Sequence, residues 1–173
     1  KMAKTLILGG VKSGKSRLAE QRATNSELPV LYVATARADD NEMQQRIVLH
    51  QQQRPAHWTT IEVPLHLAAA LQQQDAANIC ILVDCLTLWL TNLLLADDEK
   101  FIRDEIQQLL DTLPTLQAEI ILVSNETSMG IVPMGELTRR FCDEAGRLHQ
   151  QLAVMVDNVI LTVAGLPHAL KGN

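Results

Sequence analysis

The stretch Gly9-Gly10-Val11-Lys12-Ser13-Gly14-Lys15-Ser16 decides the fold expected of this chain. It fits the pattern G-x-x-x-x-G-K-S, and it stands between the apolar run Thr5–Leu8 and a helical pattern that starts at Lys15. Glycines let backbone N–H groups close around phosphate oxygens, and the N-terminus of the following helix attracts the same anion. Lys15 is placed to reach the β- and γ-phosphates, and the Ser16 hydroxyl can ligate Mg²⁺. The sequence therefore predicts a phosphate-binding loop (P-loop) for a nucleoside triphosphate.

Short apolar runs alternate with helical patterns along the rest of the chain. We expect strands at 5–9, 30–34, 59–63, 79–84, 119–124 and 158–163, and helices at 15–24, 41–53, 65–74, 86–96, 99–113 and 135–156. Runs such as Ile79–Val83 and Ile120–Val123 are apolar on both faces, which is typical of parallel strands covered on both sides. The predicted fold class is α/β, a P-loop NTPase with a mostly parallel sheet and helices on both faces, in a single domain over residues 1–173.

Composition and charge restrict the kinds of molecule that the protein is expected to bind and the compartment in which it is expected to work. The chain has 173 residues, of which 47% are hydrophobic and 20% charged, as in globular proteins. A formal net charge of −5 argues against a nucleic-acid or anionic-membrane partner. Its three cysteines form no CxxC pair, which favours a reducing compartment and hence the cytoplasm. The apolar run Ile79–Ala96 contains Asp84, which would cost about 3 kcal/mol inside a bilayer, so we expect a buried strand and helix and no membrane span.

Acidic and amide side chains follow two of the expected core strands. Asp84 ends the strand at 79–84, where a carboxylate can hold Mg²⁺ in P-loop enzymes, although it could also cap the helix that begins at Leu86. Asn125 and Glu126 follow the strand at 119–124 and are further active-site candidates, or polar loop residues. The guanine-recognition motif Asn-Lys-x-Asp is missing from the sequence. A regulatory GTPase is therefore disfavoured, and the sequence does not determine which nucleotide base the protein binds.

A charged stripe that contains one histidine follows the helix expected at 41–53. Its members recur every four residues: Glu42, Arg46, His50 and Arg54. Because Pro55 disfavours helical geometry in the residue before it, we expect Arg54 to swing free at the helix end. Imidazole is a good nucleophile toward phosphorus, and arginines can neutralise phosphate charge. Spacing alone leaves open that His50 is a solvated surface residue, and it does not support a zinc site. The other histidines are expected to be structural: His57, His66, His149 and His168.

These motifs, taken together, resemble the adenosylcobinamide kinase/adenosylcobinamide-phosphate guanylyltransferase family over essentially 5–171. Besides the P-loop, the resemblance rests on the following stretches: Ala34-Thr35-Ala36, Asp40-x-Glu42-Met43-x-x-Arg46-Ile47-x-x-His50-x-x-x-Arg54-Pro55-x-x-Trp58, Asp84-Cys85-Leu86-Thr87-Leu88-Trp89-Leu90-Thr91-Asn92-Leu93-Leu94, Ser124-Asn125-Glu126, Met129-Gly130-Ile131-Val132-Pro133 and Ala164-Gly165-Leu166-Pro167. The blocks around His50 and at Asn125–Pro133 are specific, whereas many families share a P-loop. The chain departs from the family at Thr127-Ser128, often Val-Gly, and at His149, often Asn.

The resemblance implies a RecA-like fold, a homotrimer with sites at subunit interfaces, and two reactions. ATP or GTP would phosphorylate adenosylcobinamide. GTP would then guanylylate His50, and the GMP would pass to adenosylcobinamide phosphate. Catalytic roles fall on His50 and Lys15, and Mg²⁺ binding on Ser16 and Asp84. The implied nucleotide contacts are Gly9, Gly10, Val11, Lys12, Ser13, Gly14, Lys15, Ser16, Ala34, Thr35, Ala36, Gln51, Gln52, Gln53, Arg54, Glu62 and Asp84. Two alternatives remain: a simple P-loop kinase of a small molecule without guanylyltransferase activity, and a non-catalytic nucleotide-binding module.

Overall fold

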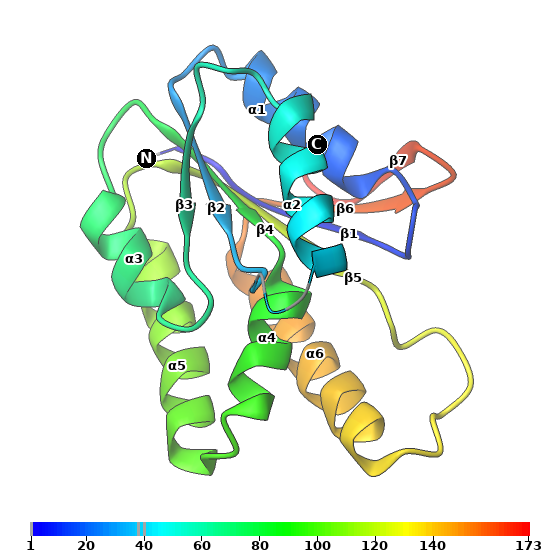
Figure 1. Ribbon diagram of the computed structural model, residues 1–173. Helices are drawn as coiled ribbons and strands as arrows, with labels where there is room; N and C mark the ends of the chain where they lie inside the picture. The colour runs from blue at the N-terminus through cyan, green and yellow to red at the C-terminus, as the bar shows by residue number, and fades with distance from the viewer. Residues whose placement is uncertain (1, 38, 40) are drawn as a thin grey trace.

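A single sheet forms the centre of the computed structural model, which describes residues 2–37, 39 and 41–173 (Figure 1). Within these residues the sheet has seven strands in the order β3-β2-β4-β5-β1-β6-β7. The strands are β1 (Lys4–Gly9), β2 (Val30–Ala34), β3 (Thr59–Glu62), β4 (Cys80–Asp84), β5 (Glu119–Asn125), β6 (Asn158–Val163) and β7 (Leu166–Lys171). All neighbouring pairs are parallel except β6 and β7, which are antiparallel. The predicted mostly parallel α/β sheet is confirmed.

The helices connect these strands close to where the sequence predicts them. They are α1 (Lys15–Asn25), α2 (Asn41–Gln53), α3 (Leu67–Gln74), α4 (Leu86–Leu95), α5 (Glu99–Thr112) and α6 (Glu136–Met155), with a short 3₁₀ turn, η1 (Leu113–Thr115). Helix α5 shows why the boundaries fall where they do. The Asp98 carboxylate accepts a hydrogen bond from the N–H of Phe101 at 3.1 Å and so caps the helix. Ile102 and Leu109 place an apolar stripe in the core.

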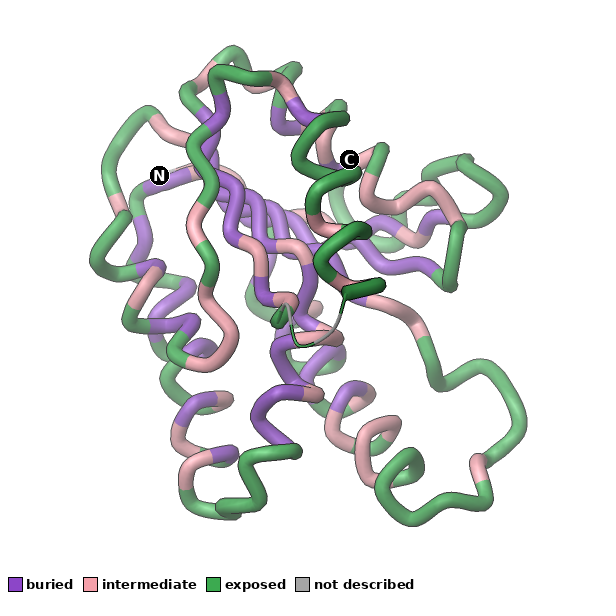
Figure 2. The backbone as a smooth tube through the Cα atoms, in the orientation of Figure 1, coloured by how far each residue is buried: buried purple, intermediate pink, exposed green. Residues whose placement is uncertain are grey.

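Two hydrophobic layers cover the two faces of the sheet. Alternate residues of β1 show the division: Leu6 and Leu8 belong to the core shared with α3, α4, α5 and α6, whereas Ile7 packs in the core that contains Ala19 and Ala23 of α1. Figure 2 shows the burial of the central strands and the exposure of most of α2, which has no buried residue. The prediction of helices on both faces is confirmed. Among the described residues, no helix is both long and apolar enough to cross a membrane.

Strand β7 is an element that the sequence analysis did not predict. It pairs with β6 across a turn at Ala164 and Gly165, whose φ angles are 52° and 76°. All six of its residues are exposed, and Pro167 stands within it. An edge strand that buries neither face carries no alternation of apolar and polar residues, and so it gives no periodic signal.

The register of the sheet gathers five strand ends at one edge. Ala34 at the end of β2 stands opposite Asp84 at the end of β4. Gly9 at the end of β1 stands opposite Asn125 of β5 on one side and Thr162 of β6 on the other. In open parallel sheets ligands bind outside the carboxyl ends of the strands. The fold therefore places the P-loop, Asp84 and Asn125 at one site.

Candidate active site at the carboxyl edge of the sheet

The P-loop has the backbone geometry that a phosphate cradle requires. Gly14 precedes α1 with φ 93°, and Lys12 has φ 53°. A Cβ atom on Gly9 would lie 2.9 Å from the backbone carbonyl oxygen of Thr162 and 2.3 Å from Ser13 Oγ, so a larger residue would force the loop or β6 to shift. Lys15 Nζ donates a hydrogen bond to the carbonyl oxygen of Gly10 at 3.1 Å, within the loop itself. The ammonium group is thus already held over the cradle, where the phosphates of a nucleotide would lie.

The β6–β7 hairpin supports the P-loop from the far side. The N–H of Gly165 donates to the carbonyl oxygen of Ser13 at 2.7 Å. A Cβ on Gly14 would come within 3.0 Å of the Cα of Gly165, so the two backbones touch. In the sequence, Ala164 and Gly165 belong to a stretch that resembles the family, and no role was predicted for them. The glycine in a turn was the available signal, but the contact itself depends on the position of β7.

A cavity of 310 Å³ opens beside the P-loop and brings together most of the chemistry expected at this edge. Six elements and the segments that follow them contribute to its wall: α1, β2, α2, β4, α4 and β5. The lining residues are Ser16, Tyr32, Ala34, Ala36, Met43, Arg46, Ile47, His50, Arg54, Asp84, Cys85, Thr87, Leu88 and Asn125. Ser16, Asp84 and the pair His50 and Arg54 come from three distant parts of the sequence and therefore share one cavity only through the fold.

Arg54 takes a different position from the one predicted. Its guanidinium carbon lies 3.6 Å from the centre of the Tyr32 ring, and the residue is 8% exposed. The Tyr32 hydroxyl in turn donates to Asp84 Oδ2 at 2.7 Å. The expectation that Arg54 swings free was wrong. The helix ends before Pro55, and the Arg54 side chain turns inward, where a cation–π contact with the Tyr32 ring holds it. The result is a stack that places a positive charge beside the carboxylate at the end of β4.

His50 lies on the inward-facing part of α2 but remains exposed to solvent. Met43 and Ile47 of the same helix are half-buried and line the cavity, as predicted. Arg46 also lines it and pairs with Glu42 one turn earlier at 2.7 Å. Three members of the charged stripe thus form one wall of the cavity, where His50 stands in the sequence between Arg46 and Arg54.

The negative charge of Asp84 raises the pKa of several neighbouring groups. Burial, and then the charge of Asp84, raises the pKa of Glu20 on α1, while Arg54 and His50 act in the opposite direction. Burial and the same carboxylate also raise the pKa values of Tyr32 and Cys85. Glu20 was not among the predicted site residues, although it stands one helical turn after Ser16. Acidic groups on α1 and β4 thus face basic groups on α2.

The remaining predicted nucleotide contacts divide into two groups. Ala34 and Ala36 line the cavity, whereas Thr35 between them is fully buried. The Thr35 hydroxyl donates to the carbonyl oxygen of Cys85 at 2.6 Å and accepts from its N–H at 3.0 Å, which joins β2 to the start of α4. The second group lies outside the lining of the cavity and is exposed: Gln51, Gln52, Gln53 and Glu62. Their assignment to the nucleotide stays a prediction, and Asp40 of the His50 block lies outside the described residues.

Ser16 and Asp84 offer the oxygen ligands that suit Mg²⁺. The Ser16 hydroxyl and the Asp84 carboxylate line the same cavity, and Tyr32 donates to one carboxylate oxygen. No cluster of three or more His, Cys, Asp or Glu residues that could hold a metal occurs among the residues described. Mg²⁺ commonly takes one or two protein oxygens and completes its shell with water and substrate phosphates. The donor set therefore fits Mg²⁺ bound together with a nucleotide.

Comparison with known proteins identifies the family of this chain. Residues 5–170 match the family described as "Cobinamide kinase / cobinamide phosphate guanyltransferase". The chain belongs to this family. It is 59% identical to the "Bifunctional adenosylcobalamin biosynthesis protein CobP" of Pseudomonas aeruginosa over 96% of both chains. It is 42% identical to the "Bifunctional adenosylcobalamin biosynthesis protein CobU" of Salmonella typhimurium, over 96% of this chain and 98% of that protein. The resemblance seen in the sequence is confirmed.

Solved structures of proteins with much lower sequence identity share the fold. A KaiC-like protein from Pyrococcus horikoshii OT3 covers 92% of this chain and 70% of its own with a TM-score of 0.50 and 14% identity. The RadB recombinase gives a TM-score of 0.53 at 15% identity, over 92% of this chain and 73% of its own. At such identities the likeness concerns the fold alone. The predicted RecA-like P-loop fold is confirmed, and this member of the cobinamide kinase family builds its site at the edge of that sheet.

Proposed function

We propose that the chain phosphorylates adenosylcobinamide and then transfers GMP from GTP to the product, through a covalent histidine intermediate. The observation that carries this proposal is the single cavity that Ser16, Asp84 and His50 share. A kinase alone needs the first two residues and has no use for a histidine. A nucleophile in the wall of the cavity that Ser16 also lines is what a second reaction, at the α-phosphate, requires.

In the kinase step the alcohol oxygen of the acceptor attacks the γ-phosphorus of ATP or GTP. The bond from the γ-phosphorus to the bridging oxygen breaks, and the nucleoside diphosphate leaves. Lys15 and the N–H groups of the P-loop balance the charge that develops on the phosphate oxygens. Ser16 and Asp84 would hold Mg²⁺, which neutralises phosphate charge when it is bound. The Tyr32 hydroxyl fixes the orientation of the Asp84 carboxylate.

In the transfer step a ring nitrogen of His50 attacks the α-phosphorus of GTP. An N–P bond forms, the bond to the β-phosphate oxygen breaks, and pyrophosphate leaves. A phosphate oxygen of the phosphorylated acceptor then attacks the same phosphorus, and the N–P bond breaks to restore the imidazole. Arg46 and Arg54 lie on the same wall of the cavity and are placed to balance charge on the α-phosphate.

Labelling with GTP tests the histidine directly. Incubation with GTP that carries ³²P at the α-position, together with Mg²⁺, should label the protein through an acid-labile bond. His50→Ala should abolish the label, whereas His168→Ala, a substitution of another exposed histidine, should keep it. A labelled His50→Ala protein would remove His50 from the mechanism. Phosphorylation of adenosylcobinamide without any label in the wild type would favour the simple kinase, an alternative that the exposure of His50 also permits.

Assembly and location extend the proposal. Val48 and Leu49 are exposed next to His50 on α2, and they border a hollow of 620 Å³ on the outer side of that helix. Apolar side chains at such a position support a subunit contact close to the site, as in the expected homotrimer. Analytical ultracentrifugation of the wild type tests it, and a monomer at assay concentration would contradict it. The free cysteines Cys80, Cys85 and Cys142 support a reducing compartment such as the cytoplasm.

A further inference from the structure

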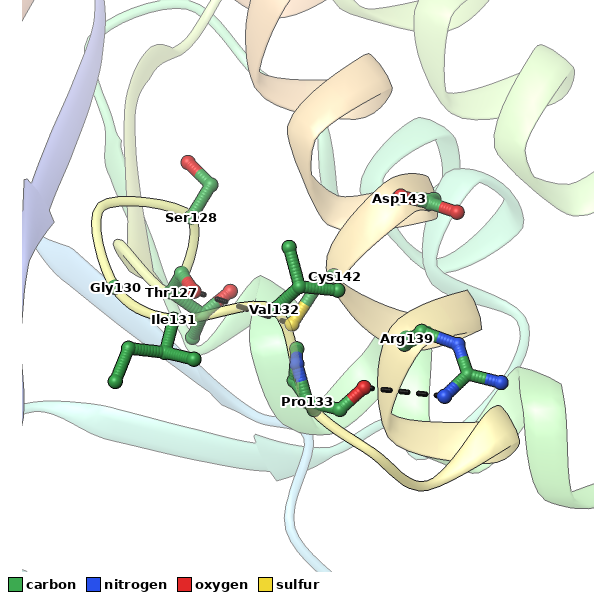
Figure 3. A pocket seen from close by; sticks show the side chains of 9 residues that line it. All are labelled: Thr127, Ser128, Gly130, Ile131, Val132, Pro133, Arg139, Cys142 and Asp143. Atoms are coloured by element: carbon green, nitrogen blue, oxygen red, sulfur yellow. Dashed lines mark hydrogen bonds between the residues drawn. The ribbon is translucent and has the colours of Figure 1, made fainter.

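A second hollow lies between the loop that follows β5 and the first turns of α6 (Figure 3). Its volume is 310 Å³, and its wall consists of loop residues between Thr127 and Pro133 together with Arg139, Cys142 and Asp143. The loop contains the block Met129–Pro133, one of the two stretches that carried the specific resemblance to the family. The phosphoryl and guanylyl chemistry described above uses none of these residues.

Large apolar side chains stand out from this loop into solvent. Met129 is 74% exposed, Ile131 97%, Val132 73% and Met134 96%, and Leu137 at the start of α6 adds another. Single exposed hydrophobic residues are ordinary on protein surfaces, whereas several in one short segment mark a binding surface. We refer to residues 127–134 with Leu137 as the apolar loop.

Polar contacts fix the backbone of the apolar loop. The Arg139 guanidinium reaches back from α6 and donates to the carbonyl oxygen of Pro133 at 3.1 Å (Figure 3). It also donates to the carbonyl oxygen of Met134. At the other end, the Glu126 carboxylate accepts from the N–H of Ser128 at 2.6 Å and from its hydroxyl. Burial raises the pKa of Glu126, but the hydrogen bonds from Ser128 and Thr127 and the charge of His149 together outweigh it, so that the pKa is lowered. The polar groups thus bond within the protein while the apolar groups face outward.

The apolar loop is continuous with the active site. Asn125, the last residue of β5, lines the active-site cavity, and Thr127 two residues later lines the second hollow. The N–H of Glu126 donates to the carbonyl oxygen of Gly9 at 2.9 Å, so the root of the loop is bonded to the first residue of the P-loop motif. A molecule lying on the loop can therefore reach into the active-site cavity with a short arm.

The acceptor of the proposed reactions has the shape that this arrangement requires. A corrinoid is a wide macrocycle with apolar faces, amide groups around its rim and one arm that ends in the reacting alcohol. The active-site cavity of 310 Å³ is at the lower end of the range for a small-molecule site, and a nucleotide must also enter it. The macrocycle must then lie outside the cavity while its arm lies inside.

We propose that the apolar loop is the platform on which the corrinoid ring of the acceptor lies. Ile131, Val132 and Met134 contact the ring face, and Asp143 and Ser128 in the wall of the second hollow accept or donate hydrogen bonds at its amide rim. The reacting arm passes Asn125 into the active-site cavity. This inference rests on the proposed function, because it assumes a corrinoid acceptor.

The double variant Ile131→Ser/Met134→Ser tests the platform, with Val154→Ser as the matched control. Val154 is another apolar residue that is largely exposed (81%), and it lies near the far end of α6. The double variant should raise the KM for adenosylcobinamide in the kinase step by about tenfold or more, because it removes apolar area buried by the ring. Its self-guanylylation by GTP alone should stay within about twofold of wild type, because no corrinoid takes part in that step. The control should change neither quantity.

Three outcomes would overturn the inference. A KM for adenosylcobinamide within about twofold of wild type, with guanylylation intact, would show that the ring lies elsewhere. A smaller assembly of the double variant in sedimentation velocity would assign the apolar loop to contact with a second copy of the chain. Loss of guanylylation in the double variant would place the loop in the nucleotide site. Failure of the proposed function itself looks different, since the wild type would then lack guanylylation or turnover of the corrinoid.

Discussion

The imidazole of His149 and the hydroxyl of Ser124 lie 2.7 Å apart in the interior, between α6 and β5. Ser124 Oγ is 3.3 Å from Thr87 Oγ1, which accepts the N–H of Asn125 at 2.7 Å. Because Thr87 and Asn125 line the active-site cavity, these hydrogen bonds connect a buried histidine to the edge of the site. The pKa of His149 is lowered by burial, although the nearby charge of Glu126 opposes the shift.

The lowered pKa of His149 predicts that the protein loses stability in mild acid. Below about pH 6.5 the unfolded chain binds a proton on this imidazole that the folded chain does not bind until a lower pH. The free energy of unfolding should therefore fall as the pH drops from 7.5 toward 5.5, by about 1.4 kcal/mol for each unit between the two pKa values. His149→Asn, the residue that often stands here in the family, should flatten this part of the profile. Urea unfolding at both pH values measures the difference, and parallel profiles would show that His149 does not cause it.

Tyr32→Phe should weaken binding of the nucleotide with its metal while the fold persists. The substitution removes the hydrogen bond to Asp84 Oδ2 but keeps the ring beneath Arg54. A hydrogen bond to a charged group contributes about 1.5–3 kcal/mol, so the KM for Mg²⁺-GTP should rise roughly tenfold or more. Tyr32→Leu, which also removes the ring, should have a larger effect on both KM and thermal stability. If Tyr32→Phe leaves the KM unchanged, the hydroxyl does not orient Asp84 for the metal.

Lys15→Ala should reduce the kinase rate by several orders of magnitude. Lys15 Nζ bonds to the Gly10 carbonyl oxygen over the cradle, and its removal leaves the β- and γ-phosphates without their fixed cation. Lys100→Ala is the control, since this lysine is exposed on α5 and pairs only with Asp104 among the ion pairs of the described residues. Steady-state turnover of adenosylcobinamide gives the comparison. Near-normal turnover in Lys15→Ala would mean that the loop is not the catalytic cradle.

Gly165→Ala should disturb the P-loop through the hairpin that supports it. Open space surrounds the position of the new Cβ, so the cost comes from the positive φ of 76°, about 1 kcal/mol for a residue other than glycine. Gly14→Ala should be worse, because its Cβ also meets the Gly165 backbone at 3.0 Å. Differential scanning calorimetry and nucleotide binding by the two variants rank them. An equal or larger loss in Gly165→Ala would contradict the steric explanation.

Local sequence determined much of this protein. The pattern from Gly9 to Ser16 predicts the P-loop without knowledge of the tertiary structure, because a strand, a glycine turn and a helix start lie next to one another along the chain. The order of strands and helices also followed from periodicity, since apolar strands such as β4 and amphipathic helices such as α5 repeat at different intervals. The residues around His50 were compatible with a nucleophile but also with a solvated surface histidine, and only the resemblance to the family implied the catalytic role. The structure places His50 in the wall of the cavity that Ser16 also lines.

Tertiary structure decided which side chains meet. Tyr32 and Asp84 stand 52 residues apart, and Ser124 and His149 stand 25 apart, on different elements in each case. No spacing rule joins such pairs, because the register of the sheet and the packing of helices on it set their distance. The position of Arg54 was predicted wrongly for the same reason, because the ring that it contacts, Tyr32, lies on strand β2. Strand β7 was not predicted because it buries neither face. A strand shows a regular alternation of apolar and polar residues only where one of its faces is buried.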